Sequence, residues 1–457
     1  MHLAGIDTDE PRARGARHCR DGGSGCSHGP RCAAKPVGEY FLRGAPGSRP
    51  HRVTRRRLPR WSELRPYLRT GPLARSPVER RLAGAASIGD LQRIARRHTP
   101  RAVFDYVDGA AETETSLRRA REAFARLEFV PSVLRDVSSI DTSTTILGQP
   151  SALPLAFAPT GFTRLMNHEG EPAVARVAER VGIPYALSTL GTTSPEALAA
   201  AAPHAQKWFQ LYLWRDRDAS RELIARAKAA GFAALVLTVD VPVAGARLRD
   251  VRNGFSIPPA LTIKTFADIA VHPGWWFNLL TTEPLTFASL NTWQGTVAEL
   301  INQTFDPSVT MADLGWLRGA WSGPVVVKGV QTVDDACAVV DAGADAIVIS
   351  NHGGRQLDRG PTPLEQLSRI VDAVGDRTEV YLDGGVMGGA DVVGAVAMGA
   401  RGCLVGRAYL YGLMAGGERG VQRAADLLRQ EIVRTMALLG VRSIAELTRD
   451  RAFLRER

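Results

Sequence analysis

The sequence predicts an α/β protein, a (β/α)8 TIM barrel whose functional groups lie at the C-terminal face of the strands. After residue 150, short apolar runs alternate with helical segments, a pattern typical of buried parallel strands joined by crossover helices. Several runs end in polar residues, and in a barrel the strand C-termini form the active-site face. Eight such runs favour the barrel over an open, doubly wound sheet. The predicted strands are 153–159, 183–188, 208–213, 233–240, 324–329, 346–350, 379–384 and 403–406.

Two regions precede the barrel. Residues 1–52 are rich in Gly, Pro, Arg, Ser and His and show no periodicity, so we expect a disordered basic extension. Residues 53–150 predict a helical segment that packs on the barrel. There, Ser87 is placed to cap a helix whose apolar residues follow at helical spacing. The barrel itself is expected over residues 151–457.

The stretch between the fourth and fifth predicted strands is too long for an ordinary βα connection. We therefore expect an excursion at about residues 245–320, which carries Trp275, Trp276 and Trp293. The excursion could close the site as a lid. It could also touch a membrane surface, because aromatic residues suit that interface.

The composition is that of a soluble globular protein, with 45% hydrophobic and 23% charged residues. Much of the net charge of +10 comes from the first 60 residues, where Arg55, Arg56 and Arg57 form a short basic run. A basic run is also consistent with a tail that binds nucleic acid. A solvated arm is the simpler interpretation, and we expect no nucleic-acid partner.

Cysteine usage and hydropathy predict the compartment. Five cysteines spread over 457 residues do not suggest a disulfide scaffold, which favours the cytoplasm. Cys19, Cys26 and Cys32 form no CxxC pair, so we expect no metal site. We find neither an apolar run of the roughly 18–20 residues that a spanning helix needs nor the apolar core of a signal peptide. Peripheral contact with the inner face of the cell membrane stays open.

The segment SNHGGRQLD, residues 350–358, is the strongest indication of chemistry. It places His352 and Arg355 three residues apart, directly after a predicted strand, in a loop that Gly353 and Gly354 keep open. A histidine can serve as a general base near neutral pH, and an arginine can hold a carboxylate through two parallel hydrogen bonds. Oxidation of a 2-hydroxy acid needs both groups, so we expect the catalytic centre here.

From about Ile88 to about Leu447 the sequence resembles the FMN-dependent 2-hydroxy acid dehydrogenase and oxidase family. The resemblance rests on FDYVDGAAE, LAFAPTGF, EGE, FQLY, LTVDVP, VVKGV, SNHGGRQLD, DGGV and VGR, which occur in the family's order. It implies FMN at the C-terminal face of the barrel and oxidation of an L-2-hydroxy acid. Within the family, AGARLRDVRNGFSIPPALT, WWFNLLTTEPL and GRAYLYGLMAGGERGV are similar to the actinobacterial L-lactate dehydrogenase branch, whose members are linked to a quinone or a cytochrome.

The resemblance implies a proton-transfer set at the strand ends. His352 would be the base that takes the substrate proton, and Asp240 would stabilise the imidazolium that results. Lys328 would lie on the N1 side of the flavin, where its positive charge stabilises developing negative charge. A plain buried ion pair is the alternative interpretation of Lys328 and Asp240.

The resemblance also implies a substrate-binding set. Arg355 would bind the carboxylate with help from Tyr106, and Tyr212 would form a hydrogen bond with the hydroxyl oxygen. Arg247, seven residues after Asp240, matches a second family arginine that faces the substrate. Ordinary packing is the alternative for the two tyrosines.

For the cofactor, the resemblance implies contacts to the flavin ring and to the phosphate. A phosphate after the last two strands is common in barrels, where glycines expose backbone N–H groups. The ring contacts would be Thr160, Ser188, Gln210, Thr238 and Lys328, and the phosphate contacts Asp383, Gly384, Gly385, Gly406 and Arg407. Met387 departs from the family, because many members carry an arginine there. FMN would then bind less tightly, or Arg407 and backbone amides would suffice. No GxGxxG follows an early strand, so a nicotinamide site is unsupported.

The substrate and the acceptor are interpreted from the same branch. The resemblance implies that Leu190, where glycolate oxidase has a bulky tryptophan, and Gly161 after Thr160 leave room for a methyl group, and longer aliphatic acids could also enter. We therefore expect oxidation of L-lactate to pyruvate, with electrons passed from reduced FMN to a quinone or another external acceptor. The alternatives are a mycofactocin-maturation flavoenzyme with a peptide-derived substrate, an oxygen-using 2-hydroxy acid oxidase, and an FMN-binding barrel without turnover.

Two further expectations follow from the resemblance. The family's tetramers predict a homotetramer. The resemblance to lactate dehydrogenases begins near Val53, which predicts that residues 1–52 are absent from the natural protein.

Overall fold

The computed structural model describes residues 57–67, 76–254, 268–285, 288 and 305–456. The chain divides into two units, residues 1–71 and residues 72–457. In the first unit, α1 (Trp61–Leu64) and η1 (Arg65–Tyr67) follow each other, and Glu63 accepts a hydrogen bond from the backbone N–H of Arg60. The extension predicted over residues 1–52 lies outside the described residues.

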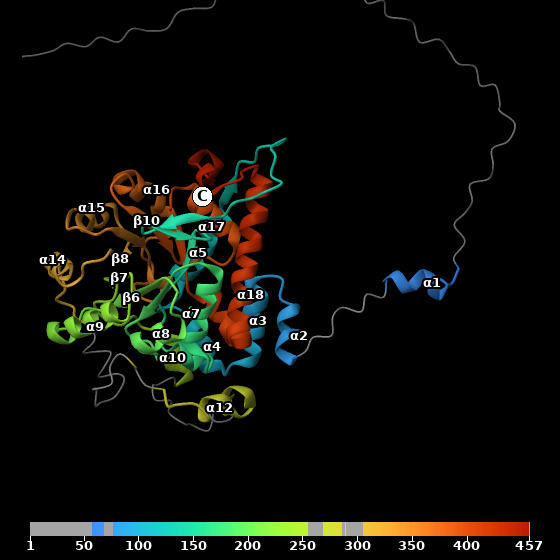
Figure 1. Cartoon of the computed structure of the whole chain (residues 1–457), viewed down its shortest axis with the longest axis horizontal. Helices are drawn as coiled ribbons and strands as arrows, with labels where there is room; N and C mark the ends of the chain where they lie inside the picture. Colours follow the sequence, from blue (N-terminus) through green and yellow to red (C-terminus); the bar gives the residue numbers. More distant parts are fainter. Residues whose placement is uncertain (1–56, 68–75, 255–267, 286–287, 289–304, 457) are drawn as a thin grey trace, which may run out of the picture. The chain divides into compact units, whose positions relative to one another are not determined.

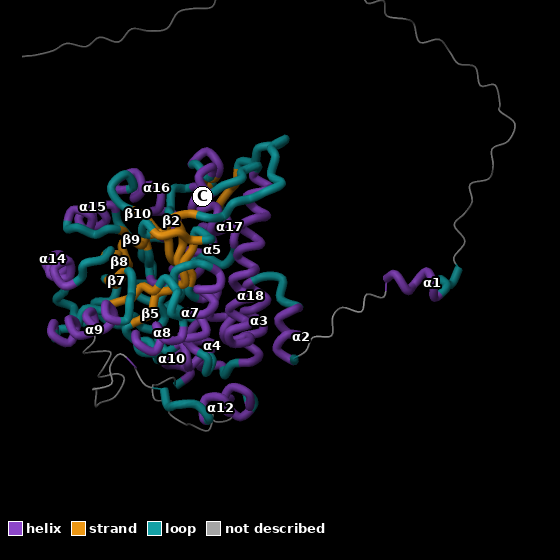
Figure 2. The backbone as a smooth tube through the Cα atoms, viewed as in Figure 1, coloured by secondary structure: helices purple, strands orange, loops and turns teal. Residues whose placement is uncertain are grey.

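The second unit is built on a closed barrel of eight parallel strands, which confirms the predicted fold class (Figures 1 and 2). Each predicted apolar run overlaps one strand. The strands are β4 (Leu155–Phe157), β5 (Tyr185–Ser188), β6 (Lys207–Leu211), β7 (Ala234–Thr238), β8 (Val325–Val330), β9 (Ala346–Ile349), β10 (Glu379–Asp383) and β11 (Gly402–Val405). The register aligns polar residues at one end, since Ser188 lies opposite Gln210 and Thr238 lies opposite Lys328.

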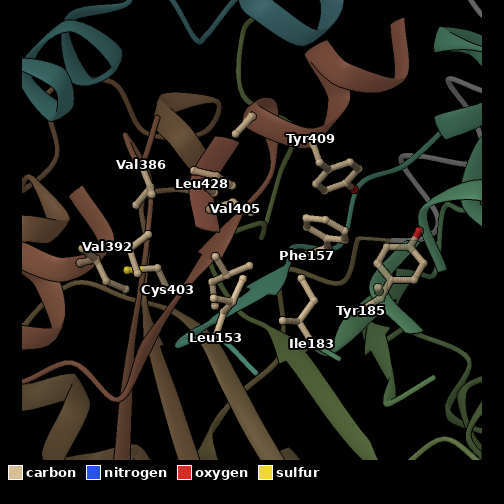
Figure 3. Close-up of a cluster of buried hydrophobic side chains, with 14 of the residues drawn as sticks. Leu153, Phe157, Ile183, Tyr185, Val386, Val392, Cys403, Val405, Tyr409 and Leu428 are labelled. Carbon is tan, nitrogen blue, oxygen red and sulfur yellow. The ribbon is translucent and has the colours of Figure 1, made fainter. Parts of the chain in front are cut away.

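Helices surround this barrel, and a layer of apolar side chains separates them from the strands. Figure 3 shows one sector, in which the ring of Phe157 on a barrel strand lies next to the ring of Tyr409 on the helix that follows the last strand. The rings of Phe157 and Tyr409 lie 4.9 Å apart between centroids. The helices after the strands are α6 (Thr163–Met166), α7 (Gly170–Val181), α8 (Pro195–Ala201), α9 (Arg217–Ala229), α14 (Met311–Ala320), α15 (Val333–Asp341), α16 (Pro363–Val374), α17 (Gly389–Ala397) and α18 (Arg407–Leu439).

The barrel interior is filled mainly by small and β-branched residues, and its N-terminal end is closed by a hairpin. The hairpin pairs β2 (Thr144–Ile146) with β3 (Gln149–Ser151), and Ile146 packs into the interior beside Trp208 and Tyr381. At its tip, the backbone N–H of Leu147 donates to Glu379 Oε2 at 2.9 Å and to Tyr381 Oη at 3.2 Å. The hairpin therefore leaves the opposite end of the barrel uncovered, where the strands carry their polar residues.

The remaining elements cover one side of the barrel and its C-terminal face. α3 packs along α18, as the capped amphipathic pattern predicted, with Ser87 accepting a hydrogen bond from the Asp90 N–H. The remaining elements are α2 (Pro77–Ala83), α3 (Ile88–His98), α4 (Arg101–Asp108), α5 (Thr115–Ala125), β1 (Leu127–Phe129), η3 (His352–Gly354), η4 (Ile444–Glu446), η5 (Arg449–Arg451) and β12 (Ala452–Leu454).

The predicted excursion is described in part. Within its predicted bounds the structure describes α10 (Leu248–Asn253), α12 (Pro273–Leu280) and α14, and Trp293 lies outside the described residues. On α12, the ring N–H of Trp275 donates to the backbone oxygen of Leu165 at 2.9 Å, which holds this helix against α6.

A sharp kink at Gly416 and Gly417 lets α18 pack against itself. A Cβ atom on Gly420 would lie 1.8 Å from the backbone oxygen of Gly412, so the two halves meet where neither residue has a side chain. The first half carries Arg407 and Tyr409, which reach the C-terminal face. The kink therefore helps to position that face.

We predict that Gly420→Ala lowers the free energy of unfolding by about 1–3 kcal/mol or more, because backbone must move to admit the methyl group. The matched control is Gly315→Ala in α14, where a Cβ would meet no atom within 4 Å. The control should be neutral or stabilising by up to about 1 kcal/mol, because alanine is the better helix former. Thermal unfolding of both variants measures this. Equal melting temperatures would contradict the close packing at the kink.

Candidate functional site

A cavity of about 670 Å³ opens at the C-terminal ends of the strands and collects most of the predicted site residues. Those that line it are Tyr106, Thr160, Ser188, Tyr212, Arg247, Lys328, His352, Arg355, Asp383, Gly384, Gly385, Gly406 and Arg407. The other three, Gln210, Thr238 and Asp240, lie behind this surface and contact or flank its residues. Residues as distant in sequence as Tyr106 and Arg407 thus share one site.

His352 is held by a buried carboxylate. Its Nδ1 lies 3.0 Å from Oδ1 of Asp240, whose side chain is only 2% exposed. Burial raises the pKa of Asp240, but the attraction of His352 and Lys328 outweighs it, so the pKa lies below its ordinary value. A neutral His352 would then donate its Nδ1 proton to Asp240 and keep the lone pair on Nε2. Such a nitrogen can accept a proton.

The backbone around His352 and Asp240 is closely packed, and one position there admits only glycine. His352 adopts a left-handed conformation with φ of 56°. A Cβ on Gly329, at the end of β8, would lie 2.7 Å from the Cβ of Asp240. The glycine is therefore required for Asp240 to reach the imidazole.

Two arginines gather around one aromatic ring. The guanidinium carbons of Arg355 and Arg247 lie 4.9 Å and 5.4 Å from the centre of the Tyr106 ring. Burial, and then the charge of Arg247, lower the pKa of Arg355 to about 10, so it stays positive at neutral pH. Arg247 also pairs with Asp250 at 3.7 Å. Two cations in a half-enclosed cavity favour an anionic ligand such as a carboxylate.

A buried network beneath the cavity joins Lys328 to the loop of residues 350–358. Lys328 Nζ lies 3.0 Å from Oδ2 of Asp383 and donates to Ser350 Oγ at 3.0 Å. Ser350 donates to Asp383 at 2.6 Å and accepts from the His352 backbone N–H at 3.0 Å. Burial opposes the charge of Lys328, but Asp383 and Asp240 outweigh it and raise its pKa. Lys328 therefore supplies a permanent positive charge.

The polar groups around the cavity fit a flavin. Gln210 Nε2 and Thr238 Oγ1 are buried at the strand ends, and neither has a hydrogen-bond partner among the described residues. Buried polar atoms are normally satisfied, so these two atoms fit the polar edge of a bound ring. Thr160 Oγ1 is instead 2.6 Å from the hydroxyl of Tyr409.

The predicted phosphate end contains a glycine turn. Gly384 and Gly385 have φ values of 103° and 85°, which favour glycine, and a Cβ on Gly385 would lie 3.0 Å from that of Ala120. Arg407 is engaged with backbone: it donates to the carbonyl oxygens of Val107, Gly353 and Gly109 at 2.7–2.9 Å. The turn offers open backbone to an anion.

Sequence reasoning missed Asp358, although it is the last residue of SNHGGRQLD. Its Oδ2 accepts from the Thr113 hydroxyl at 2.6 Å and from the backbone N–H groups of Thr113 and Thr115. Its Oδ1 accepts from the Ser116 N–H at 2.8 Å. Through these hydrogen bonds, Asp358 connects the loop of residues 350–358 to the N-terminus of α5. Ser350 was missed as well, although it begins the same motif.

The strand ends of this (β/α)8 barrel carry a His–Asp pair, two neighbouring arginines and buried polar atoms that suit a flavin ring. This combination is that of a flavin-dependent oxidoreductase. Residues 95–454 match the family described as FMN-dependent dehydrogenase. The chain belongs to the FMN-dependent alpha-hydroxy acid dehydrogenase and oxidase family, and FMN is its cofactor.

Relatives support this assignment. A provisionally named L-lactate dehydrogenase of Mycobacterium tuberculosis is 57% identical over 393 residues, which cover 86% of this chain and 95% of the relative. The L-lactate dehydrogenase of Caulobacter vibrioides is 44% identical, over 79% of this chain and 96% of the relative. Among solved structures, a monotopic membrane protein, (S)-mandelate dehydrogenase, superposes with a TM-score of 0.78 at 35% identity and covers 81% of this chain and 100% of its own.

We predict that Asp358→Ala lowers the free energy of unfolding by about 2 kcal/mol at neutral pH, because the amides at the start of α5 lose their acceptor. Burial raises the pKa of Asp358, but hydrogen bonds from Thr113 and the backbone outweigh it and lower the pKa. A lowered pKa in the folded state stabilises the fold above the ordinary carboxyl pKa of about 4, and that stabilisation is lost on acidification.

The difference between the wild type and Asp358→Ala should therefore shrink as the pH falls below about 4. Denaturant titrations at several pH values measure it. Asp376→Ala, at an exposed carboxylate, is the matched control and should cost little at any pH. A difference that grows on acidification would contradict the assignment.

Proposed function

We propose that this enzyme oxidises L-lactate to pyruvate, with His352 as the base. The observation that carries the proposal is the pairing of His352 with buried Asp240 in the cavity that also receives Arg355 and Arg247. A 2-hydroxy acid presents a carboxylate and a hydroxyl on adjacent carbons. The arginines and the imidazole offer a partner for each group.

In the proposed reaction, the substrate loses two protons and two electrons as its C2 hydroxyl becomes a carbonyl. Arg355 and Arg247 bind the carboxylate, and both guanidinium groups lie over the Tyr106 ring. Tyr212 contacts the hydroxyl oxygen, and His352 Nε2 takes the hydroxyl proton. Asp240 then stabilises the imidazolium by its charge, which is why its pKa must stay low.

FMN, when bound, would accept the two electrons together with the second proton, the one from C2. The groups to hold it are Ser188, Gln210, Thr238 and Lys328, with Asp383–Gly385 and Gly406 toward its phosphate. Lys328 contributes fixed positive charge in a buried setting, where electrostatic stabilisation is strong. Burial raises the pKa of Tyr212, so this residue stays a neutral hydrogen-bond donor.

The choice of lactate rests on the wall of the cavity and on the relatives. Gly161 and Leu190 touch, since a Cβ on Gly161 would lie 3.1 Å from that of Leu190. Phe305 packs edge-on against Tyr212 at 5.1 Å and completes an apolar wall beside the substrate groups. An apolar wall suits a methyl group, although hydrophobic pockets discriminate one methylene by only about 1–3 kcal/mol. The similarity to L-lactate dehydrogenases favours lactate among the acids that fit.

We also propose an external acceptor, a quinone, and peripheral contact with the inner face of the cell membrane. No helix in the described part of the chain is long and apolar enough to cross a membrane. On and beside α12, however, Val271, Phe277 and Leu280 are 71%, 57% and 74% exposed, while Trp275 anchors the helix to the barrel. Exposed apolar side chains on an anchored helix favour a lipid surface. The predicted homotetramer stays a prediction.

We predict that L-lactate bleaches the visible flavin absorbance of the wild type under anaerobic conditions, and that His352→Ala slows this by at least about 10²–10⁴-fold. His204→Ala, at an exposed histidine outside the cavity, is the control and should bleach at the wild-type rate. Unchanged bleaching in His352→Ala with FMN bound would refute the base. Colour that returns quickly with a quinone and slowly in air supports a dehydrogenase, whereas prompt return in air indicates an oxidase.

If FMN-bound wild type is not bleached by L-lactate, the proposed substrate is wrong, and the peptide-maturation alternative should be tested instead.

We predict that the protein floats with anionic liposomes and that Phe277→Asp combined with Leu280→Asp abolishes flotation. Two carboxylates on the exposed face of α12 would oppose insertion into an anionic interface. Leu438→Asp changes another exposed leucine, on α18, and should leave flotation intact. Flotation of the double variant at the wild-type level would exclude α12 as the contact surface. Lactate bleaching checks that both variants are folded.

A further inference from the structure

We propose that Arg121, on α5, binds the phosphate of FMN and replaces the cation that Met387 does not supply. This inference rests on the proposed position of the phosphate at the Gly384–Gly385 turn. Met387 lines the same cavity with an uncharged side chain. A dianionic phosphate in a partly enclosed site requires positive charge nearby.

The position of Arg121 is fixed by close backbone packing. A Cβ on Gly385 would lie 3.0 Å from the Cβ of Ala120, so α5 lies directly against the glycine turn. Arg121 follows Ala120, lines the cavity, and donates from Nη1 to the backbone oxygen of Gly385. Its guanidinium is therefore at the turn itself.

Arg121 also keeps donors available. Nη1 pairs with Oδ2 of Asp391 at 2.7 Å, and this carboxylate also accepts the Met387 N–H at 2.8 Å. Neither Nε nor Nη2 of Arg121 has a hydrogen-bond partner among the described residues, and the side chain is 43% exposed. Asp391 thus orients the fork and offsets part of its charge, while three N–H groups stay available to phosphate oxygens.

The other cations around the cavity are engaged elsewhere. Arg407 donates to three backbone carbonyls, and Lys328 is bound to Asp383 and Ser350. Arg247 and Arg355 lie against Tyr106. Arg118 turns toward the start of α5, where it donates to the Thr113 oxygen at 2.8 Å and to Thr115 Oγ1 at 3.1 Å. Arg121 is the cavity-lining cation that contacts the glycine turn.

The test compares FMN with riboflavin, which lacks the phosphate. Apoprotein is titrated with each flavin, and quenching of flavin fluorescence gives both dissociation constants. We expect Arg121→Ala to raise the constant for FMN by about tenfold or more, since it removes charged hydrogen bonds, and to leave that for riboflavin unchanged. Arg121→Lys, which keeps the charge without the fork, should fall between the two.

Two further variants sharpen the result. Arg119→Ala removes the same charge from α5 at a residue outside the cavity lining and should leave both constants unchanged. Adding Met387→Arg to Arg121→Ala should restore FMN binding, because it places a cation on the same turn. Riboflavin binding at the wild-type level shows that each variant is folded.

An unchanged FMN constant in Arg121→Ala, or an equal loss for FMN and riboflavin, would overturn the inference. Wild-type protein that binds both flavins equally would overturn it too, together with the proposed phosphate position. The proposed function is judged separately, by lactate bleaching of the wild type at saturating FMN. Bleaching together with an unchanged FMN constant in Arg121→Ala would reject Arg121 and keep the function.

Discussion

The carboxylate of Asp358 accepts hydrogen bonds from the first turn of α5, and this contact holds together two parts of the site that are distant in sequence. On one side, the same loop carries His352 to Asp240 and Arg355 to Tyr106. On the other side, α5 lies against the glycine turn at the end of β10. A Cβ on Gly354 would come within 2.8 Å of the Leu117 N, so the loop and the helix meet without a gap. Displacement of this loop would therefore disturb the His352–Asp240 pair, the position of Arg355 and the glycine turn together.

The charge balance of the cavity explains why it should bind anions at both ends. Buried Asp383 is paired with Lys328 and buried Asp240 with the His352 imidazole, and Arg355, Arg247 and Arg407 add positive charge to the cavity. Two arginines share the Tyr106 ring, whose negative face reduces the cost of bringing like charges together. A carboxylate at one end and a phosphate at the other would offset the remaining charge. The site is electrostatically incomplete until ligands with negative charge enter it.

The strands and most of the residues that line the cavity could be predicted because their signals are local. An apolar run such as 346–350 followed by His352 and Arg355 announces both a buried strand and an exposed functional end. Asp358 and Arg121 could not be assigned this way. Asp358 accepts hydrogen bonds from an N-terminus more than 240 residues away, and Arg121 donates to a glycine turn 264 residues away. Many of their partners are backbone atoms, which leave no residue-type signal in the sequence.

The hairpin closes the N-terminal end of the barrel, and the candidate site lies at the opposite end. Leu147 is fixed there by Glu379 and Tyr381, at the start and middle of β10, whereas Asp383 and the glycine turn occupy the end of the same strand. One strand thus locks the barrel shut at its base and presents ligand groups at its top, about four residues apart. Met387, which lines the cavity near the top, is thus remote from the contacts of Leu147 that close the base. This separation gives the chain freedom to alter its ligand contacts over evolutionary time while its scaffold stays constant.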